Sequence, residues 1–169
     1  MIDAPFAPTI RSVGLNGLLV TFGDKATDDA NRAAIAFRSA VDALGWPEIA
    51  ESSSTLVSAF FRIDLSEHPF EDLQARLAEV VGTQDWGAAA LPAGRALWTI
   101  PAVFGGDRAP QLAEAAEAAG RSLAEAEADL TGTRLRVLTL GFAPGQPYLG
   151  TLGEAWNIPR QVGLSPNIP

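Results

Sequence analysis

Residues 138–153, LTLGFAPGQPYLGTLG, form the most distinctive stretch of this sequence. They hold four glycines and two prolines in sixteen residues, directly after an alternating run, 133–140, that predicts a half-buried strand. The glycine–proline turn within it, residues 141–150, has two interpretations. It is either a rim that contacts a ligand or partner, because glycine permits close approach, or a corner at which Phe142 and Tyr148 pack inward. The residues alone leave both open.

The chain between residue 95 and this turn predicts one strand and two short helices. RALWTIPAVFGG, 95–106, predicts a strand that ends at Gly105-Gly106. A helix is expected over 110–120, and Ser122 with Glu125 forms a capping box for another short helix. The residues of the first helix expected to face inward are Leu112, Ala115, Ala116 and Ala119.

The region after the turn predicts little regular structure. One or two strands and a glycine-rich turn cannot close a barrel or cover their own edges. We therefore expect an incomplete second domain over 95–169, shortened either in nature or by truncation.

The first part of the chain begins with a hairpin and a helix. The triplet LNG, 15–17, lies between apolar runs and is a tight-turn signal, which predicts strands at Val13 and over 18–22. Thr27 can cap a helix that ends before Gly45. Its apolar positions repeat every 3.6 residues: Ala30, Ala34, Phe37, Val41 and Leu44.

A second pair of strands and a second helix follow. The strands are predicted over 48–53 and 55–63, and the helix from Pro69 to Gly82, with Phe70, Leu73, Leu77 and Val80 on one face. The order ββαββα is typical of an antiparallel sheet covered on one face by helices, so we predict an α+β, ferredoxin-like sandwich over 1–82. Small residues, glycine and proline in 83–94 predict a linker.

Composition excludes several classes of partner and chemistry. Twenty acidic and twelve basic residues give a formal net charge of −8, which disfavours nucleic acid. No stretch approaches the roughly 20 apolar residues of a membrane span, and the start lacks a leader pattern, so a soluble cytoplasmic protein is expected. The absence of cysteine and the single histidine predict no thiolate nucleophile and no metal site.

No self-contained catalytic constellation stands out. His68 precedes a helix start and is expected to cap it or meet solvent, and Ser52, Ser53 and Ser54 lack a nucleophile elbow. Gly105-Gly106 could cradle an anion through backbone N–H groups, with a simple turn as the alternative. Asp107 and Arg108 follow in the loop, where a binding group would project. Carboxylates at surface spacing are expected at Glu114, Glu117, Glu125 and Glu127.

Taken in order, LLVTFGD (18–24), IPAVFGG (100–106), the glycine–proline turn and Pro159-Arg160 resemble a known family. It is the KipI / allophanate hydrolase subunit 1 family, whose bacterial members include one of the components of the ATP-dependent 5-oxoprolinase. The family pattern G-F-x-P-G-F-x-Y-L-G is matched by Gly141, Phe142, Pro144, Gly145, Tyr148, Leu149 and Gly150. The resemblance implies an N-terminal α/β domain followed by a cyclophilin-like β-barrel domain.

Some positions depart from the family pattern. Leucine or glutamine replaces a polar or aromatic family residue at Leu15, Gln111, Leu130, Leu135 and Gln146, and Leu164-Ser165 replaces a second Pro-Arg pair. The family also continues with a Gly-Ser strand and a Pro-Gly-Gly-Trp segment. No catalytic residue is therefore carried over.

The resemblance implies a subunit of an ATP-dependent amide- or lactam-cleaving complex of 5-oxoprolinase or allophanate hydrolase type. Such a subunit is inactive alone and shares its site with a second, cyclophilin-like subunit; ATP is the cofactor of the complex. Arg160 matches the first Pro-Arg pair, and its guanidinium suits a carboxylate or phosphate of a ligand, with a structural salt bridge as the alternative. Trp98 and Trp156 are expected to pack, or to anchor a partner. The alternative function is a non-catalytic, KipI-like inhibitor that binds a sensor histidine kinase, and a purely structural domain is the third.

Overall fold

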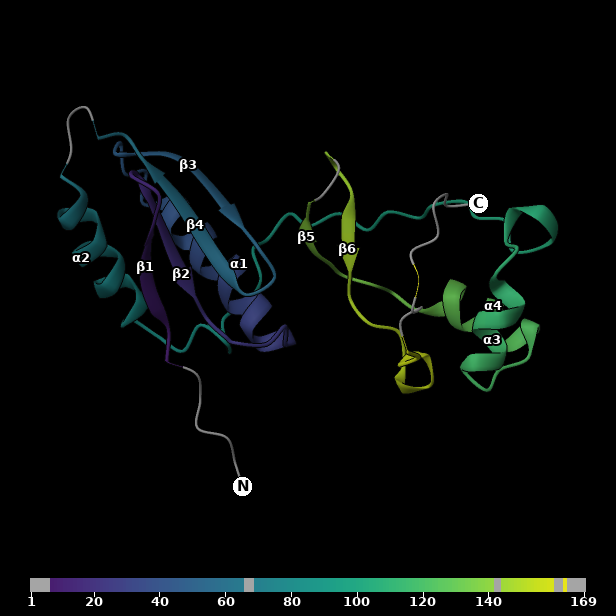
Figure 1. Cartoon of the computed structure of the whole chain (residues 1–169). Coiled ribbons are helices and arrows are strands. Elements are labelled where there is room, and N and C mark those ends of the chain that lie inside the picture. Colours follow the sequence, from purple (N-terminus) through teal and green to yellow (C-terminus); the bar gives the residue numbers. More distant parts are fainter. Residues whose placement is uncertain (1–6, 66–68, 142–143, 160–162, 164–169) are drawn as a thin grey trace, which may run out of the picture. The chain divides into compact units, whose positions relative to one another are not determined.

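The computed structural model describes residues 7–65, 69–141, 144–159 and 163, and the chain divides into two compact units (Figure 1). The first unit comprises residues 1–95 and 138–147, and the second comprises 96–137 and 148–169. Antiparallel strands and helices are mixed, which confirms the predicted α+β class. The described strands form no closed barrel, and the ferredoxin-like and cyclophilin-like arrangements stay predictions.

A four-stranded antiparallel sheet forms the centre of the first unit. Its strands are β1 (Thr9–Val13), β2 (Gly17–Thr21), β3 (Ile49–Ser54) and β4 (Ser58–Ile63), in the order β1-β2-β4-β3. The two predicted strand pairs are hairpins, and they join along β2 and β4, where Leu18 lies opposite Phe61. Both predicted pairs are thereby confirmed.

Two helices cover one face of this sheet. Helix α1 (Asp28–Ala43) begins at Thr27, whose hydroxyl accepts the Ala30 backbone N–H at 3.2 Å, so the predicted cap is confirmed. Helix α2 (Phe70–Val81) contributes the buried Leu73 and Leu77 to the same core. The predicted apolar positions of α1 are buried except Leu44, which is exposed because the helix ends there.

Phe37 of α1 lies at the centre of an aromatic cluster. Its ring centroid is 5.2 Å from that of Phe22, 6.0 Å from Phe61 and 5.1 Å from Trp86. Trp86 is buried and donates its indole N–H to the Val81 carbonyl at 3.0 Å. Residues 83–94, predicted as a linker, therefore contribute a core side chain.

The second unit contains the helices α3 (Leu112–Ala118) and α4 (Leu123–Gly132), with single 3₁₀ turns η1 (Gly106–Arg108) and η2 (Glu154–Trp156). The predicted capping box of Ser122 and Glu125 is confirmed. The Asp129 carboxylate accepts the Trp156 indole N–H at 2.9 Å and pairs with Arg121 at 3.2 Å. The expected inward residues of α3 are confirmed: Ala116 is buried, and Leu112, Ala115 and Ala119 are half-buried.

The strand predicted over 95–106 is wrong. Residues 95–104 have no regular structure, and the side chains of Trp98 and Ile100 are 82% and 80% exposed. The segment contains residues that favour a strand, but it pairs with none of the described strands, so its backbone hydrogen bonds are not completed in a sheet. The expectation that Trp98 packs is wrong for the same reason. The strand predicted over 133–140 is shorter, β5 (Val137–Leu140).

Helix α4 generates a prediction about pH. Hydrogen bonds from the Ser122 backbone N–H and hydroxyl to the Glu125 carboxylate lower the pKa of Glu125 below its ordinary value of 4.5. Glu125 has a lower pKa in the folded chain than in the unfolded chain. The stability that its cap contributes is therefore fully present at pH values above the ordinary pKa, and it is lost as the pH falls through the folded pKa. An NMR titration of the Glu125 carboxyl carbon should give a pKa below 4.5.

The matched variants separate charge from geometry. Glu125→Gln keeps an acceptor for the capping box, so it should abolish the acid-induced loss of α4 helicity, measured by secondary chemical shifts. Glu127→Gln, on the same helix, should leave that loss in place. A Glu125 pKa at or above its ordinary value would contradict the capping assignment.

Candidate functional site

Strands β5 and β6 (Pro147–Leu149) form a hairpin, residues 137–149. Residues 141–146 of the glycine–proline turn close this hairpin, and the rest of the turn runs along β6 to Gly150. The Gly141 N–H donates to the Gln146 carbonyl at 3.0 Å, and beyond the other end the Gly150 N–H donates to the Arg136 carbonyl at 2.8 Å. Gly145 has a backbone φ of +81°, which glycine adopts without strain. Of the predicted site residues, Gly141, Pro144 and Gly145 lie at this turn and Tyr148 lies on β6, whereas Phe142 lies outside the described residues.

Two polar side chains hold strand β5 on the rest of the first unit. The Asn31 side-chain amide, on α1, donates to the carbonyls of Leu56 at 2.9 Å and Leu138 at 3.0 Å. The Thr139 hydroxyl donates to the Ser54 carbonyl at 3.0 Å. Asn31 is 1% exposed, so its amide is shielded from water. The strand is therefore positioned by α1 and by the last residue of β3.

Sequence reasoning missed Asn31 and Thr139. The signal available for Asn31 was a polar residue directly after Ala30 and three positions before Ala34, on the apolar side of a helix. A buried amide is expected to find partners, but nothing in the sequence identifies two carbonyls as those partners.

The hairpin is electrically neutral. Residues 137–153 contain no Asp, Glu, Lys or Arg, in a chain of net charge −8. Tyr148 is exposed rather than packed inward, and its phenol and the Gln146 amide are exposed polar groups of the turn. The stretch lacks the carboxyl, imidazole and amine groups that most often carry general acid–base catalysis, and Tyr148 is its one titratable side chain. The turn can supply shape and hydrogen bonds to a ligand or partner.

The double glycine lies in the second unit and forms an ordinary turn. Gly106 has a φ of +52°, and the Arg108 N–H donates to the Gly105 carbonyl at 3.2 Å. That N–H is therefore committed to the turn, which leaves fewer donors for an anion. Arg160 and His68 lie outside the described residues, as does Ser165.

Among residues the structure describes, no group of three or more His, Cys, Asp or Glu side chains could hold a metal ion. None of the helices in the described ranges is long and apolar enough to span a bilayer.

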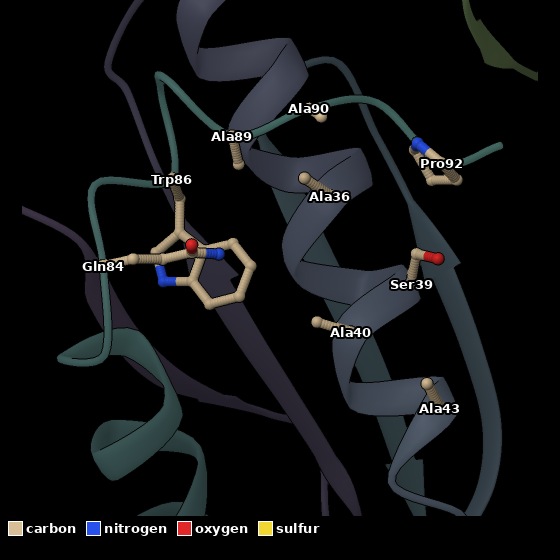
Figure 2. Close-up of a pocket in the computed structure, with 9 residues that line it drawn as sticks. All are labelled: Ala36, Ser39, Ala40, Ala43, Gln84, Trp86, Ala89, Ala90 and Pro92. Atoms are coloured by element: carbon tan, nitrogen blue, oxygen red, sulfur yellow. The ribbon is translucent and has the colours of Figure 1, made fainter.

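A hollow of about 340 Å³ lies on the side of α1 (Figure 2). Figure 2 shows that α1 supplies one wall and the segment after α2 the other. Its lining residues are neutral: Ala36, Ser39, Ala40, Ala43, Gln84, Trp86, Ala89, Ala90 and Pro92. The described lining offers small apolar surface, the Ser39 hydroxyl and the Gln84 amide, and no charged group.

Fold and site together define a mixed α/β protein with a neutral hairpin presented by an antiparallel sheet and its covering helix. The chain matches the family described as carboxyltransferase domain, subdomain C and D, over residues 8–169. It belongs to that family, and the predicted membership of the KipI / allophanate hydrolase subunit 1 family is confirmed.

A curated relative supports this membership. The chain is 28% identical over 174 residues to a Bacillus subtilis (strain 168) protein named as the 5-oxoprolinase subunit designated B. The alignment covers 95% of this chain and 70% of the relative.

Two crystal structures of a protein designated TTHA0988, each 24% identical, have a similar fold, with TM-scores of 0.64 and 0.65. They cover 95% and 88% of this chain, which spans only 30% and 27% of the solved chains.

The hairpin generates a prediction about Gly145. Alanine at a φ of +81° is strained by about 1–2 kcal/mol, and no atom of the described residues lies within 4 Å of the added Cβ, so the expected effect is backbone strain. Gly145→Ala should therefore speed hydrogen exchange of the Gly141 amide, which closes the turn, by about five- to thirtyfold.

Gly153→Ala is the matched control, because Gly153 has a φ of −56° and equally open surroundings. It should leave Gly141 exchange unchanged. Equal exchange rates in both variants would show that the turn does not depend on the backbone conformation of Gly145.

Proposed function

We propose that this chain is a non-autonomous subunit of an ATP-dependent 5-oxoprolinase-type complex, whose active site is completed by a second subunit. The observation that carries the proposal is the neutral hairpin: the part of the chain that matches the family motif most closely contains no carboxyl, imidazole or amine side chain between residues 137 and 153. The charged groups of an amide-cleaving site must then come from elsewhere. The name of the Bacillus subtilis relative, a subunit of 5-oxoprolinase, supports the same assignment.

A second feature supports a partner. Residues 96–104 contain no charged side chain, and, apart from the half-buried Phe104, the large apolar residues among them are exposed: Leu97, Trp98, Ile100 and Val103. An exposed apolar run on a protein of this charge is typical of an interaction surface. We propose that the second subunit covers this segment.

ATP is proposed for the complex and not for this chain. The described glycine-rich turn, Gly105-Gly106, has no lysine after it, and the Arg108 N–H is already bonded within the turn. These residues do not fit a triphosphate. We therefore assign no step of ATP chemistry to them.

Reconstitution tests the proposal. The chain, its subunit 2 homologue and a mixture of the two are assayed for ATP hydrolysis that depends on 5-oxoproline. Activity is expected only in the mixture, because neither part would hold the whole site. A stable complex without turnover would contradict the enzymatic role and favour a binding role such as that of KipI. Activity of this chain alone would contradict the shared site.

The exposed segment generates a variant prediction. Ile100→Asp places a charge on a surface that would lose water on association, so it should weaken binding of subunit 2 by about tenfold or more. The measurement is a titration by calorimetry. Leu123→Asp is the control: Leu123 is also exposed in the second unit, and an aspartate is favourable at the start of α4. Equal affinity of the two variants would remove residues 96–104 from the interface.

A further inference from the structure

The glycine–proline hairpin is attached to the first unit through side-chain hydrogen bonds. Asn31 donates to the Leu138 carbonyl, and Thr139 donates to the Ser54 carbonyl. Leu138 and Thr139 are consecutive residues of β5, three and two positions before the turn begins at Gly141. The same Asn31 amide donates to Leu56, so the hairpin and the turn between β3 and β4 share one donor.

Asn31 is fixed more firmly than its partners. It lies in the first turns of α1, whose neighbouring positions Ala30, Ala33 and Ala34 are buried in or against the core, and its own side chain is fully enclosed. Its backbone N–H donates to the Thr27 carbonyl at 3.1 Å, which holds it within the capped start of the helix. Movement of the hairpin away from α1 would therefore break a bond from a rigid donor.

We propose that Asn31 is a positioning residue for the glycine–proline hairpin, which it holds in the place where the second subunit meets it. Thr139 is the secondary tie. That the hairpin meets a second subunit rests on the proposed function. The positioning of the hairpin by Asn31 is a property of this chain alone. In this proposal Asn31 acts on the hairpin through β5 and not by contact with substrate or partner.

A distance measurement tests the positioning. The chain has no cysteine, so nitroxide labels can be placed on the exposed positions Gln146→Cys, in the turn, and Ala75→Cys, on α2. Both belong to the first unit. Double electron–electron resonance spectroscopy on the full chain then gives the distribution of distances between the two labels.

Three substitutions are compared in the doubly labelled chain. Asn31→Leu removes the amide donors at similar volume and should broaden the distribution, and Thr139→Val should broaden it less. Val41→Ala is the matched control, since Val41 is also buried on α1 and its side chain donates no hydrogen bond. It should lower the melting temperature and leave the distribution narrow. An unchanged distribution in both Asn31→Leu and Thr139→Val would overturn the proposal.

Affinity for subunit 2, measured on unlabelled chains, tests the functional consequence. Asn31→Leu should weaken binding by about tenfold, corresponding to one lost hydrogen bond of ordinary strength, and Val41→Ala should not. A broadened distribution with unchanged affinity would overturn the role in partner binding. If the parent chain itself fails to bind subunit 2, the proposed function fails, while the distance measurement still decides whether Asn31 positions the hairpin.

Discussion

The buried amide of Asn31 is the constraint on which the arrangement of the first unit depends. An amide shut away from water costs about 1–3 kcal/mol for each group left without a partner, so its donors must be satisfied. They are satisfied by the carbonyls of Leu56 and Leu138, in a turn of the sheet and in a strand far along the chain. An apolar side chain could fill the same volume, but it would leave both carbonyls short of a donor. One side chain thus requires that sheet, helix and hairpin come together.

The two units are stabilised by different means. The first unit buries large side chains around Phe37, and burial of apolar surface contributes about 25 cal/mol per Å². The buried apolar residues described in the second unit are alanines, Ala116 and Ala126, which have little surface to bury. Its order rests more on the capping box and on Asp129, which pairs with Arg121 and Trp156, and such contacts are individually modest. A unit of this kind gains from further burial, and its exposed Trp98 and Ile100 are the surface available for it.

The parts of the fold that could be predicted from the sequence are those whose cause is local. Thr27 and Ser122 cap helices through residues three positions away, and the first hairpin is set by its turn. The strand predicted over 95–106 fails because strand preference does not supply a neighbouring strand. The Asn31–Leu138 contact could not be predicted, because it spans 107 positions and its acceptor is a carbonyl that every residue carries. The turn was identified as a candidate site from its composition, but the residues that hold it were not.

The backbone geometry of the glycine–proline turn accounts for the residue type at some of its positions and not at others. Gly145 is explained by its positive φ. Gly150 is not, since a Cβ there would meet the Arg136 carbonyl at 3.6 Å, an ordinary contact. Tyr148 and Leu149 remain exposed on β6, so packing within the chain does not account for them either. A family pattern that includes Tyr148, Leu149 and Gly150 therefore points to a requirement from outside the hairpin. We propose that this requirement is contact with another molecule along β6, which the exposure of Tyr148 and Leu149 would allow.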